Sequence, residues 1–296
     1  MAHVPVLLNE VLETLAPREG QIMIDATVGG GGHGIPIARR LSPGGTFIGI
    51  DWDEKRLKEL REAIGQEVLD LEKLILVCSN YADLVDVLER EGIGKVNGLL
   101  IDLGFSSDQL GEGKGFAFKG KEEPLAMTYS DYDTPLYQIL GTLGERQIAE
   151  IIKDLSDERY AGRIAKAIVL ERKKSPIVTN HDLAKVVRGA VPKNYEGGRI
   201  DPATRTFMAF RIYANRELEN LGRILGGLTE IVRSGGRAVI ISYHSKEDAM
   251  VKHFFKDLAE KGEAILISKK AIKPTDLEVK QNPRSRSAKL RAIEIK

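Results

Sequence analysis

Hydrophobic and polar positions follow two alternating patterns over about the first hundred residues. Short runs that are almost entirely apolar, such as 22–24 and 47–50, are typical of strands buried on both faces. Between these runs, apolar residues recur every three or four positions, which indicates amphipathic helices. This alternation predicts a parallel sheet covered by helices on both faces. The expected elements are an opening helix over 7–15, strands over 22–24, 46–51, 73–78 and 98–103, and helices over 35–41, 53–64 and 80–91.

The alternation stops beyond residue 110. Residues 111–134 are rich in glycine, aromatic and charged residues and predict a long functional loop. Helical patterns follow with no strand among them, over 135–153, 157–173, 179–190 and 201–233. We therefore expect a helical insertion over 113–205 in a sheet domain formed by 1–112 and 206–296.

The sheet resumes with an apolar run over 237–243, which Gly235 and Gly236 introduce. Two further segments, 263–269 and 288–295, have alternating patterns, and the link between them shows no convincing helix. These features predict an antiparallel pair at the edge of the sheet. The sheet of a nicotinamide-dependent dehydrogenase would instead continue with parallel strand–helix units.

A glycine-rich stretch connects the first predicted strand to the helix after it. Four consecutive glycines, 29–32, are followed by His33 and Gly34. Glycines let the backbone approach a ligand closely, and a helix N-terminus attracts negative charge. The spacing Gly29-x-Gly31-x-x-Gly34 also satisfies the dinucleotide fingerprint, so a nicotinamide-dependent oxidoreductase is one hypothesis.

Two carboxylates at predicted strand ends favour another ligand. Asp25 would face a pyrophosphate unfavourably but could bind an amine, and Asp51 is placed to hold ribose hydroxyls. S-adenosylmethionine has a ribose and an ammonium group and no phosphate. The expected fold class is therefore α/β, a class I S-adenosylmethionine-dependent methyltransferase sheet, Rossmann-like, with an inserted all-helical domain.

Composition narrows the class of protein further. The chain has 296 residues, of which 42% are hydrophobic and 29% charged, as in globular proteins. No apolar run approaches the ~20 residues of a membrane span, and the N-terminus does not resemble a signal peptide, so we expect a cytoplasmic protein. The single cysteine, Cys78, is predicted to be a buried strand residue. The five scattered histidines indicate no metal site.

The net charge of +1 conceals two basic segments. Residues 159–216 contain 13 Lys or Arg against 4 Asp or Glu, and residues 280–296 contain 6 against 1. Such segments predict contact with a polyanion, although solvated helix faces are the alternative. Arg205, Arg284 and Arg286 are the candidates for contact with RNA phosphates. A non-catalytic RNA-binding assembly protein is a further hypothesis.

Six stretches together resemble one known family, the ribosomal RNA small-subunit methyltransferase H family, formerly called MraW. They are HVPVLLNEV, DATVGGGGHG, DLGFSSDQL, DPATRTFMAFRIYAN, ISYHSKED and NPRSRSAKLR, in order along the chain. The resemblance implies N4-methylation of a cytidine in the decoding region of 16S ribosomal RNA with S-adenosylmethionine, in the assembled or assembling small subunit. By motif, it implies cofactor contacts from Gly31, Gly32, His33, Asp51, Tyr81, Asp102 and Gln109.

Chemistry is expected just after the fourth strand. Amino-directed methyltransferases commonly place an acid, asparagine or serine there, with an aromatic three residues later, and this chain has Asp102 and Phe105. We predict that Asp102 accepts a hydrogen bond from the amine or orients the methionyl group next to it, and that Phe105 stacks on a flipped cytosine. The alternative is that Asp102 only holds the cofactor and Phe105 is a core residue. Tyr243 and His244, at the end of the fifth parallel strand, are predicted to line the substrate pocket.

Two other assignments are open on the sequence alone. His33 either contacts the cofactor or caps the helix that follows it. Phe116 and Phe118, in the long loop, either stack on exposed bases or anchor the loop to the core.

Overall fold

The computed structural model describes residues 4–103, 113–130 and 133–296. The chain divides into two compact units. The first unit comprises Met1–Gly104 and Leu218–Lys296, and the second comprises Phe105–Glu217. The segment 113–205, expected from the sequence to be an insertion, lies inside the second unit.

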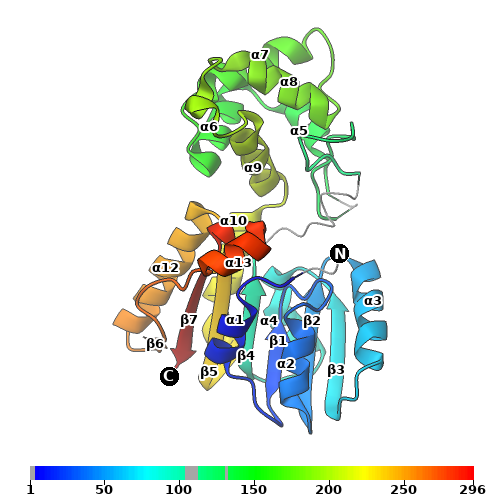
Figure 1. Ribbon diagram of the computed structural model, residues 1–296, viewed down its shortest axis with the longest axis vertical. Helices are drawn as coiled ribbons and strands as arrows, with labels where there is room; N and C mark the ends of the chain where they lie inside the picture. Colours follow the sequence, from blue (N-terminus) through cyan, green and yellow to red (C-terminus); the bar gives the residue numbers. More distant parts are fainter. Residues whose placement is uncertain (1–3, 104–112, 131–132) are drawn as a thin grey trace. The chain divides into compact units, whose positions relative to one another are not determined.

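The first unit is built on a seven-stranded sheet with the order β3-β2-β1-β4-β5-β7-β6 (Figure 1). Strands β1 to β5 are parallel, and β7 runs antiparallel to both β5 and β6. The predicted antiparallel pairing at the sheet edge is therefore confirmed. The strands are β1 (Ile22–Asp25), β2 (Gly45–Asp51), β3 (Leu71–Cys78), β4 (Val96–Asp102), β5 (Val232–Ser242), β6 (Ala264–Leu266) and β7 (Lys289–Ile295).

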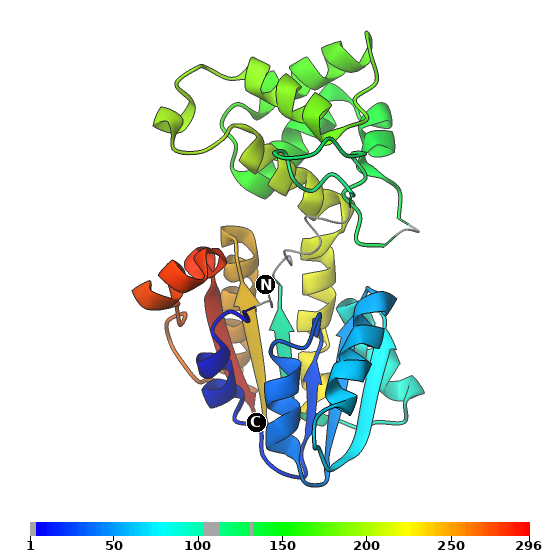
Figure 2. The ribbon, with the colours of Figure 1, turned by 45° about the vertical axis from the view of Figure 1, so that its right-hand side comes forward.

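Helices cover both faces of this sheet (Figure 2). Successive side chains of a strand point to opposite faces, so Leu99 and Ile101 of β4 enter one core cluster and Leu100 enters the other. Full burial of such a side chain contributes roughly 1.5–3 kcal/mol. One face carries α1 (Leu8–Leu15), α2 (Gly34–Leu41) and α3 (Glu54–Gly65); the other carries α4 (Leu84–Arg90), α10 (Glu217–Gly226), α11 (Leu228–Ile231) and α12 (Ser245–Glu260).

The strand order creates a topological switch point. From β1 the chain proceeds outward to β2 and β3, then returns to place β4 on the other side of β1. In open parallel sheets the ligand crevice lies outside the carboxyl ends of the strands at such a point. The loops after β1, β2 and β4 are therefore the first place to look for a site.

The second unit is formed by helices around a core of its own. Phe116 is 6% exposed in this core and stacks on Tyr129, while Phe118 meets Phe207 edge to face. Phe116 anchors its loop in this core, so its predicted alternative role in stacking on bases is wrong; for the partly buried Phe118 that role stays a prediction. The helices are α5 (Leu136–Thr142), α6 (Glu145–Ser156), α7 (Ala161–Arg172), α8 (Asn180–Ala190) and α9 (Ala203–Ala214).

Two predicted long helices are broken in the structure. The helix expected over 135–153 is divided into α5 and α6 by Gly144, whose N–H donates to Gln147 Oε1 at 2.9 Å. The helix expected over 201–233 is divided into α9, α10 and α11. At its first break Arg216 has φ +51°, and the Asn215 side chain donates to the Met127 carbonyl at 2.8 Å. A contact 88 residues away thus ends a helix that its local pattern would continue.

Three further details differ from expectation. Helix α12 was not predicted, and the link between β6 and β7 contains a short helix, α13 (Asp276–Gln281), capped by Thr275. Cys78 is exposed rather than buried, because it ends β3, the edge strand of the sheet. Among the described residues, no helix is both long and apolar enough to cross a membrane.

Candidate active site

Three carboxylates stand at the carboxyl ends of neighbouring parallel strands. Asp25 ends β1, Asp51 ends β2, and Asp102 ends β4, and β1 lies between the other two strands. The fold therefore gathers at one rim the acids that the sequence singled out at three separate positions. This rim is the switch point of the sheet.

The glycine loop after β1 is held by packing and by hydrogen bonds of its backbone. Gly29 has φ +49°, and its N–H donates to Asp51 Oδ2 at 2.8 Å. At Gly31, with φ +80°, a Cβ would lie 2.4 Å from Leu60 Cδ1. A Cβ on Gly30 would meet no atom of the described residues within 4 Å, and Gly30 is exposed among them. Glycine at position 31 thus lets one side of the loop pack closely against Leu60, while the backbone at Gly30 stays accessible to a ligand.

Asp51 is oriented by two backbone donors. Its Oδ2 accepts from Gly29 N, and its Oδ1 accepts from Asp53 N at 3.0 Å. Burial raises the pKa of Asp51, while these two hydrogen bonds oppose that shift. Because a carboxylate oxygen can accept more than one hydrogen bond, both oxygens retain capacity for hydroxyl donors. These are the acceptors that a ribose diol requires.

Asp25 is 1% exposed and accepts a hydrogen bond from Thr27 N at 3.1 Å. Burial raises the pKa of Asp25 to about 7. The nearby His33 and the Thr27 bond lower it, while Asp102 and Asp51 raise it. A buried carboxylate in this environment gains from a cationic ligand, because an ammonium group would compensate the cost of its charge.

His33 belongs to this cluster rather than to the end of its helix. It occupies the N-cap position of α2 but forms no side-chain capping bond, so the predicted capping alternative is wrong. Its Nε2 lies 2.9 Å from the Val6 carbonyl oxygen, which requires the proton on that nitrogen. Its Nδ1 lies 3.8 Å from Asp102 Oδ2. Contact between His33 and the cofactor stays a prediction.

Asp102 is positioned by two hydroxyl groups. Its N–H donates to Thr27 Oγ1 at 2.7 Å, and its side chain is hydrogen-bonded to the Tyr243 side chain. Burial and the neighbouring Asp102 raise the pKa of Tyr243, which therefore stays protonated and donates. Tyr81 begins a 3₁₀ helix, η1 (Tyr81–Asp83), directly after β3, and is partly buried against the core.

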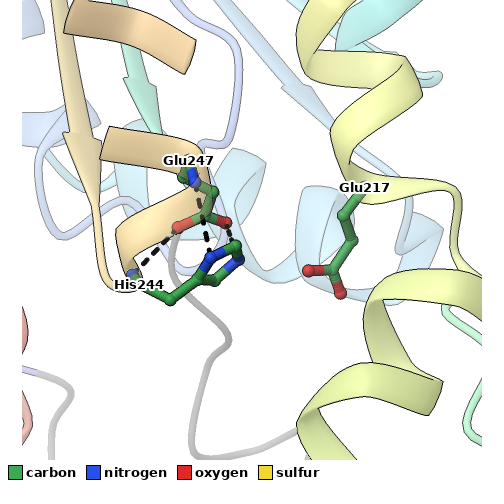
Figure 3. A group of neighbouring side chains, drawn as sticks. All are labelled: Glu217, His244 and Glu247. Atoms are coloured by element: carbon green, nitrogen blue, oxygen red, sulfur yellow. Dashed lines mark hydrogen bonds and ion pairs between the residues drawn. The ribbon is translucent and has the colours of Figure 1, made fainter. Parts of the chain in front are cut away.

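His244 has a structural role at the start of α12 (Figure 3). Its Nδ1 accepts from Glu247 N at 3.4 Å, and Glu247 Oε2 accepts from His244 N at 3.3 Å. This reciprocal arrangement is a capping box. The His244 Nε2 lies 3.1 Å from Glu247 Oε1 without hydrogen-bond geometry and has no hydrogen-bond partner in the described part of the chain.

The remaining predicted residues are three arginines, Phe105 and Gln109. Arg205 lies in the second unit, where its Nη1 is 3.1 Å from Glu196 Oε1. Arg284 and Arg286 are exposed on a 3₁₀ helix, η4 (Pro283–Ser287). Phe105 and Gln109 lie outside the described residues.

Two residues of the site were missed by sequence reasoning. Thr27 links Asp25 to Asp102, and its hydroxyl just after a strand end was the available signal. Glu247 holds the turn after β5, and the spacing His244-x-x-Glu247 follows the capping-box pattern with histidine in place of serine or threonine.

The parallel sheet ends with an antiparallel strand, β7, between β5 and β6, and it presents acids at the ends of β1, β2 and β4 around a glycine loop. These features define a class I methyltransferase. These acceptors fit S-adenosylmethionine, since Asp51 can accept from hydroxyls and Asp25 can face an ammonium group.

The chain belongs to the MraW methylase family, whose profile matches residues 1–296. It is 39% identical over 318 residues to a protein of Syntrophobacter fumaroxidans, with 99% of this chain and 96% of the relative covered. It is 42% identical over 293 residues to a protein of Coprothermobacter proteolyticus, with 98% and 95% covered. Both relatives are named ribosomal RNA small subunit methyltransferase H. Membership of a methylase family favours the methyltransferase hypothesis over the nicotinamide-dependent oxidoreductase.

Proposed function

We propose that this protein transfers a methyl group from S-adenosylmethionine to N4 of a cytidine in the decoding region of 16S ribosomal RNA. The observation that carries the proposal is the rim of Asp25, Asp51 and Asp102 around the glycine loop. The names of the relatives support ribosomal RNA as the substrate. The cytidine and its N4 position are what the resemblance of the quoted motifs to the methyltransferase H family implies.

The cofactor would be held by residues of the first unit. Asp51 would accept from the ribose hydroxyls, Asp25 would face the ammonium group, and Tyr81 would lie against adenine. Gly31, Gly32 and His33 would form the loop contacts, together with Gln109. When bound, S-adenosylmethionine supplies an activated methyl group on a sulfonium sulfur.

Asp102 is proposed to act on the cytosine amine. The amine is a weak nucleophile because its lone pair is delocalised into the ring. An acceptor that holds the amine hydrogens orients the lone pair and stabilises the positive charge that develops on nitrogen. The bonds from Asp102 N to Thr27 and from Tyr243 to the carboxylate keep this acceptor in place. Phe105 would stack on the flipped base.

The RNA is proposed to contact the basic segments. The helical unit would serve in substrate recognition, and exposed Arg284 and Arg286 would contact phosphates. Arg205 is already paired with Glu196, so its contribution would require that pair to be shared with a phosphate. The partner would be the assembled or assembling small subunit in the cytoplasm.

The decisive experiment is methyl transfer from labelled S-adenosylmethionine to small subunits that lack the modification. We expect label in 16S RNA, and nuclease digestion with mass spectrometry should locate it on N4 of one cytidine. Binding of the RNA without any incorporated label would favour the non-catalytic assembly hypothesis. Tight NAD binding without S-adenosylmethionine binding, measured by titration calorimetry, would instead favour an oxidoreductase.

The role of Asp102 is tested by Asp102→Asn, which preserves size and hydrogen bonding but removes the charge. We expect single-turnover methylation to fall by about 100-fold or more, as for the loss of a transition-state acceptor, with only a modest loss of cofactor affinity. A parallel loss of both would assign Asp102 to cofactor binding alone. An active variant that binds tightly would exclude both roles.

A further inference from the structure

The outer face of α7 carries positive charge without compensating acids. Within the helix, Ala161, Ile164, Ala165 and Ile168 are buried against the core of the second unit. The opposite face exposes Arg163, Lys166 and Leu170, and Lys173 follows at the C-cap. Because residues three and four apart are neighbours on a helix, these cations form one column. We call Arg163, Lys166 and Lys173 the α7 basic face.

On other surface helices of the same chain, exposed cations form ion pairs with acids one helical turn away. On α6 the Arg146–Glu150 pair, at 2.8 Å, spans one turn, and Lys256–Glu260 does the same on α12 at 3.1 Å. Helix α3 carries two further pairs of this kind. The α7 basic face has no ion pair among the described residues. Like charges at this spacing destabilise a helix by about 0.2–0.5 kcal/mol per pair, so the column is an unfavourable surface for the isolated protein.

An aromatic ring holds the N-terminal end of this face in place. The guanidinium groups of Arg159 and Arg163 lie 4.8 Å and 5.7 Å from the centre of the Tyr160 ring. Cation–π contact restrains the guanidinium group while leaving N–H groups at its edge to donate. Arg159 is also 4.0 Å from Glu196, whereas Arg163 has no carboxylate partner among the described residues.

We infer that the α7 basic face binds the phosphate backbone of the RNA substrate. This inference rests on the proposed function and identifies the surface of the helical unit that would contact RNA. A helix rises 1.5 Å per residue, so Arg163 and Lys166 are about 4.5 Å apart along the axis. A nucleic-acid strand presents a charge about every 3.4 Å, and such a continuous row of anions suits a column of cations without acids.

The test compares two matched double variants of the full chain. Arg163→Gln/Lys166→Gln removes two charges from the α7 basic face with little change in helix propensity. Lys153→Gln/Lys252→Gln removes two exposed charges from α6 and α12, outside both basic segments, and serves as the control. Binding to unmethylated small subunits and to purified 16S RNA is measured at salt concentrations from about 0.05 M to about 0.5 M.

The first variant should lose two phosphate contacts. Each contact contributes about 0.7 to 0.9 to the slope of log affinity against log salt, so the slope should flatten by about 1.4–1.8. If variant and parent bind equally at about 1 M salt, the RNA affinity of the variant at about 0.15 M salt should be roughly 10- to 30-fold below that of the parent. Since a phosphate contact contributes to RNA binding and not to the methyl-transfer step, KM for RNA should rise while kcat and S-adenosylmethionine affinity are retained. The control should keep the parental slope.

Several results would overturn the inference. Equal slopes for the two double variants would show that the α7 basic face does not contact phosphate. A loss confined to intact subunits, with normal binding to purified RNA, would indicate an acidic protein surface as the partner. In both cases the parent would still methylate RNA, and the proposed function would stand. A parent that transfers no methyl group to RNA would refute the proposed function instead.

Discussion

The buried carboxyl group of Asp25 should make the stability of the first unit depend on pH. Asp25 is 1% exposed, and burial raises its pKa from 3.8 to about 7. In the unfolded chain the carboxyl loses its proton near 3.8, whereas in the folded protein it keeps the proton up to about 7. Between these values only the folded state holds the proton. Raising the pH in this window therefore favours unfolding.

The size of the effect follows from the pKa difference. One unit corresponds to about 1.36 kcal/mol, so the window from 3.8 to about 7 amounts to roughly 4 kcal/mol at most. Asp25→Asn replaces the neutral carboxyl by a neutral amide and removes this titration. The stability of the variant relative to the parent should therefore increase by roughly 2.5 kcal/mol between pH 5 and about 8 and stay constant above that pH.

Urea unfolding at several pH values measures this difference. Trp52 is the only tryptophan of the chain and lies in the first unit, so its fluorescence reports on the unit that contains Asp25. Comparing variant with parent cancels the titration of other groups. Asp86→Asn, on the exposed surface of α4, is the control for removing a surface carboxylate, and the stability difference for Asp25→Asn should vary with pH much more than that of this control.

The reasoning is refuted if the stability difference between Asp25→Asn and the parent does not change with pH, since Asp25 would then titrate alike in the folded and unfolded states. A second measurement links the same group to the proposed ligand. Because an ammonium group favours the charged carboxylate, S-adenosylmethionine binding near pH 6.5 should release a proton. Calorimetry in buffers of different ionisation enthalpy would detect this release in the parent and its absence in Asp25→Asn.

Three further predictions concern the ligands. Asp51→Ala should weaken S-adenosylmethionine binding roughly 10- to 100-fold by calorimetry, because loss of a charged hydrogen-bonding partner typically costs ~1.5–3 kcal/mol. Circular dichroism should show that the variant is folded, and an affinity equal to that of the parent would assign the ribose to another residue. Arg284→Ala combined with Arg286→Ala should flatten the salt dependence of RNA binding without changing cofactor affinity, and an unaltered slope would contradict the phosphate contact. Tyr243→Phe removes the hydroxyl that donates to Asp102 and should slow single-turnover methylation about tenfold, whereas an unchanged rate would show that this bond does not position the carboxylate.

Much of the sheet and of its acidic rim could be predicted from the sequence. The apolar runs that became β1, β2 and β4 are local signals, because a strand buried on both faces must be apolar along its length. Asp25, Asp51 and Asp102 directly follow those runs, so parallel topology alone implies that they meet at one edge. The glycine loop is likewise a local feature of the chain.

Contacts between distant segments decided the rest. Asn215 ends α9 by binding the backbone of Met127, and no periodicity in the helix records that partner. Cys78 is exposed because β3 became the edge of the sheet, although its surroundings in sequence are apolar.

The partners within the site were also beyond local reasoning. Thr27 accepts from the backbone of Asp102, and Tyr243 binds the Asp102 side chain, across strands that are far apart in the chain. The ring nitrogens of His33 lie near Val6 and Asp102 and do not cap the helix that His33 precedes. The sequence by itself determined which chemical groups reach the rim, because strand ends and turns are set by nearby residues. Only the tertiary structure decided which groups pair there, because hydrogen bonds and burial depend on what the fold brings within a few ångströms.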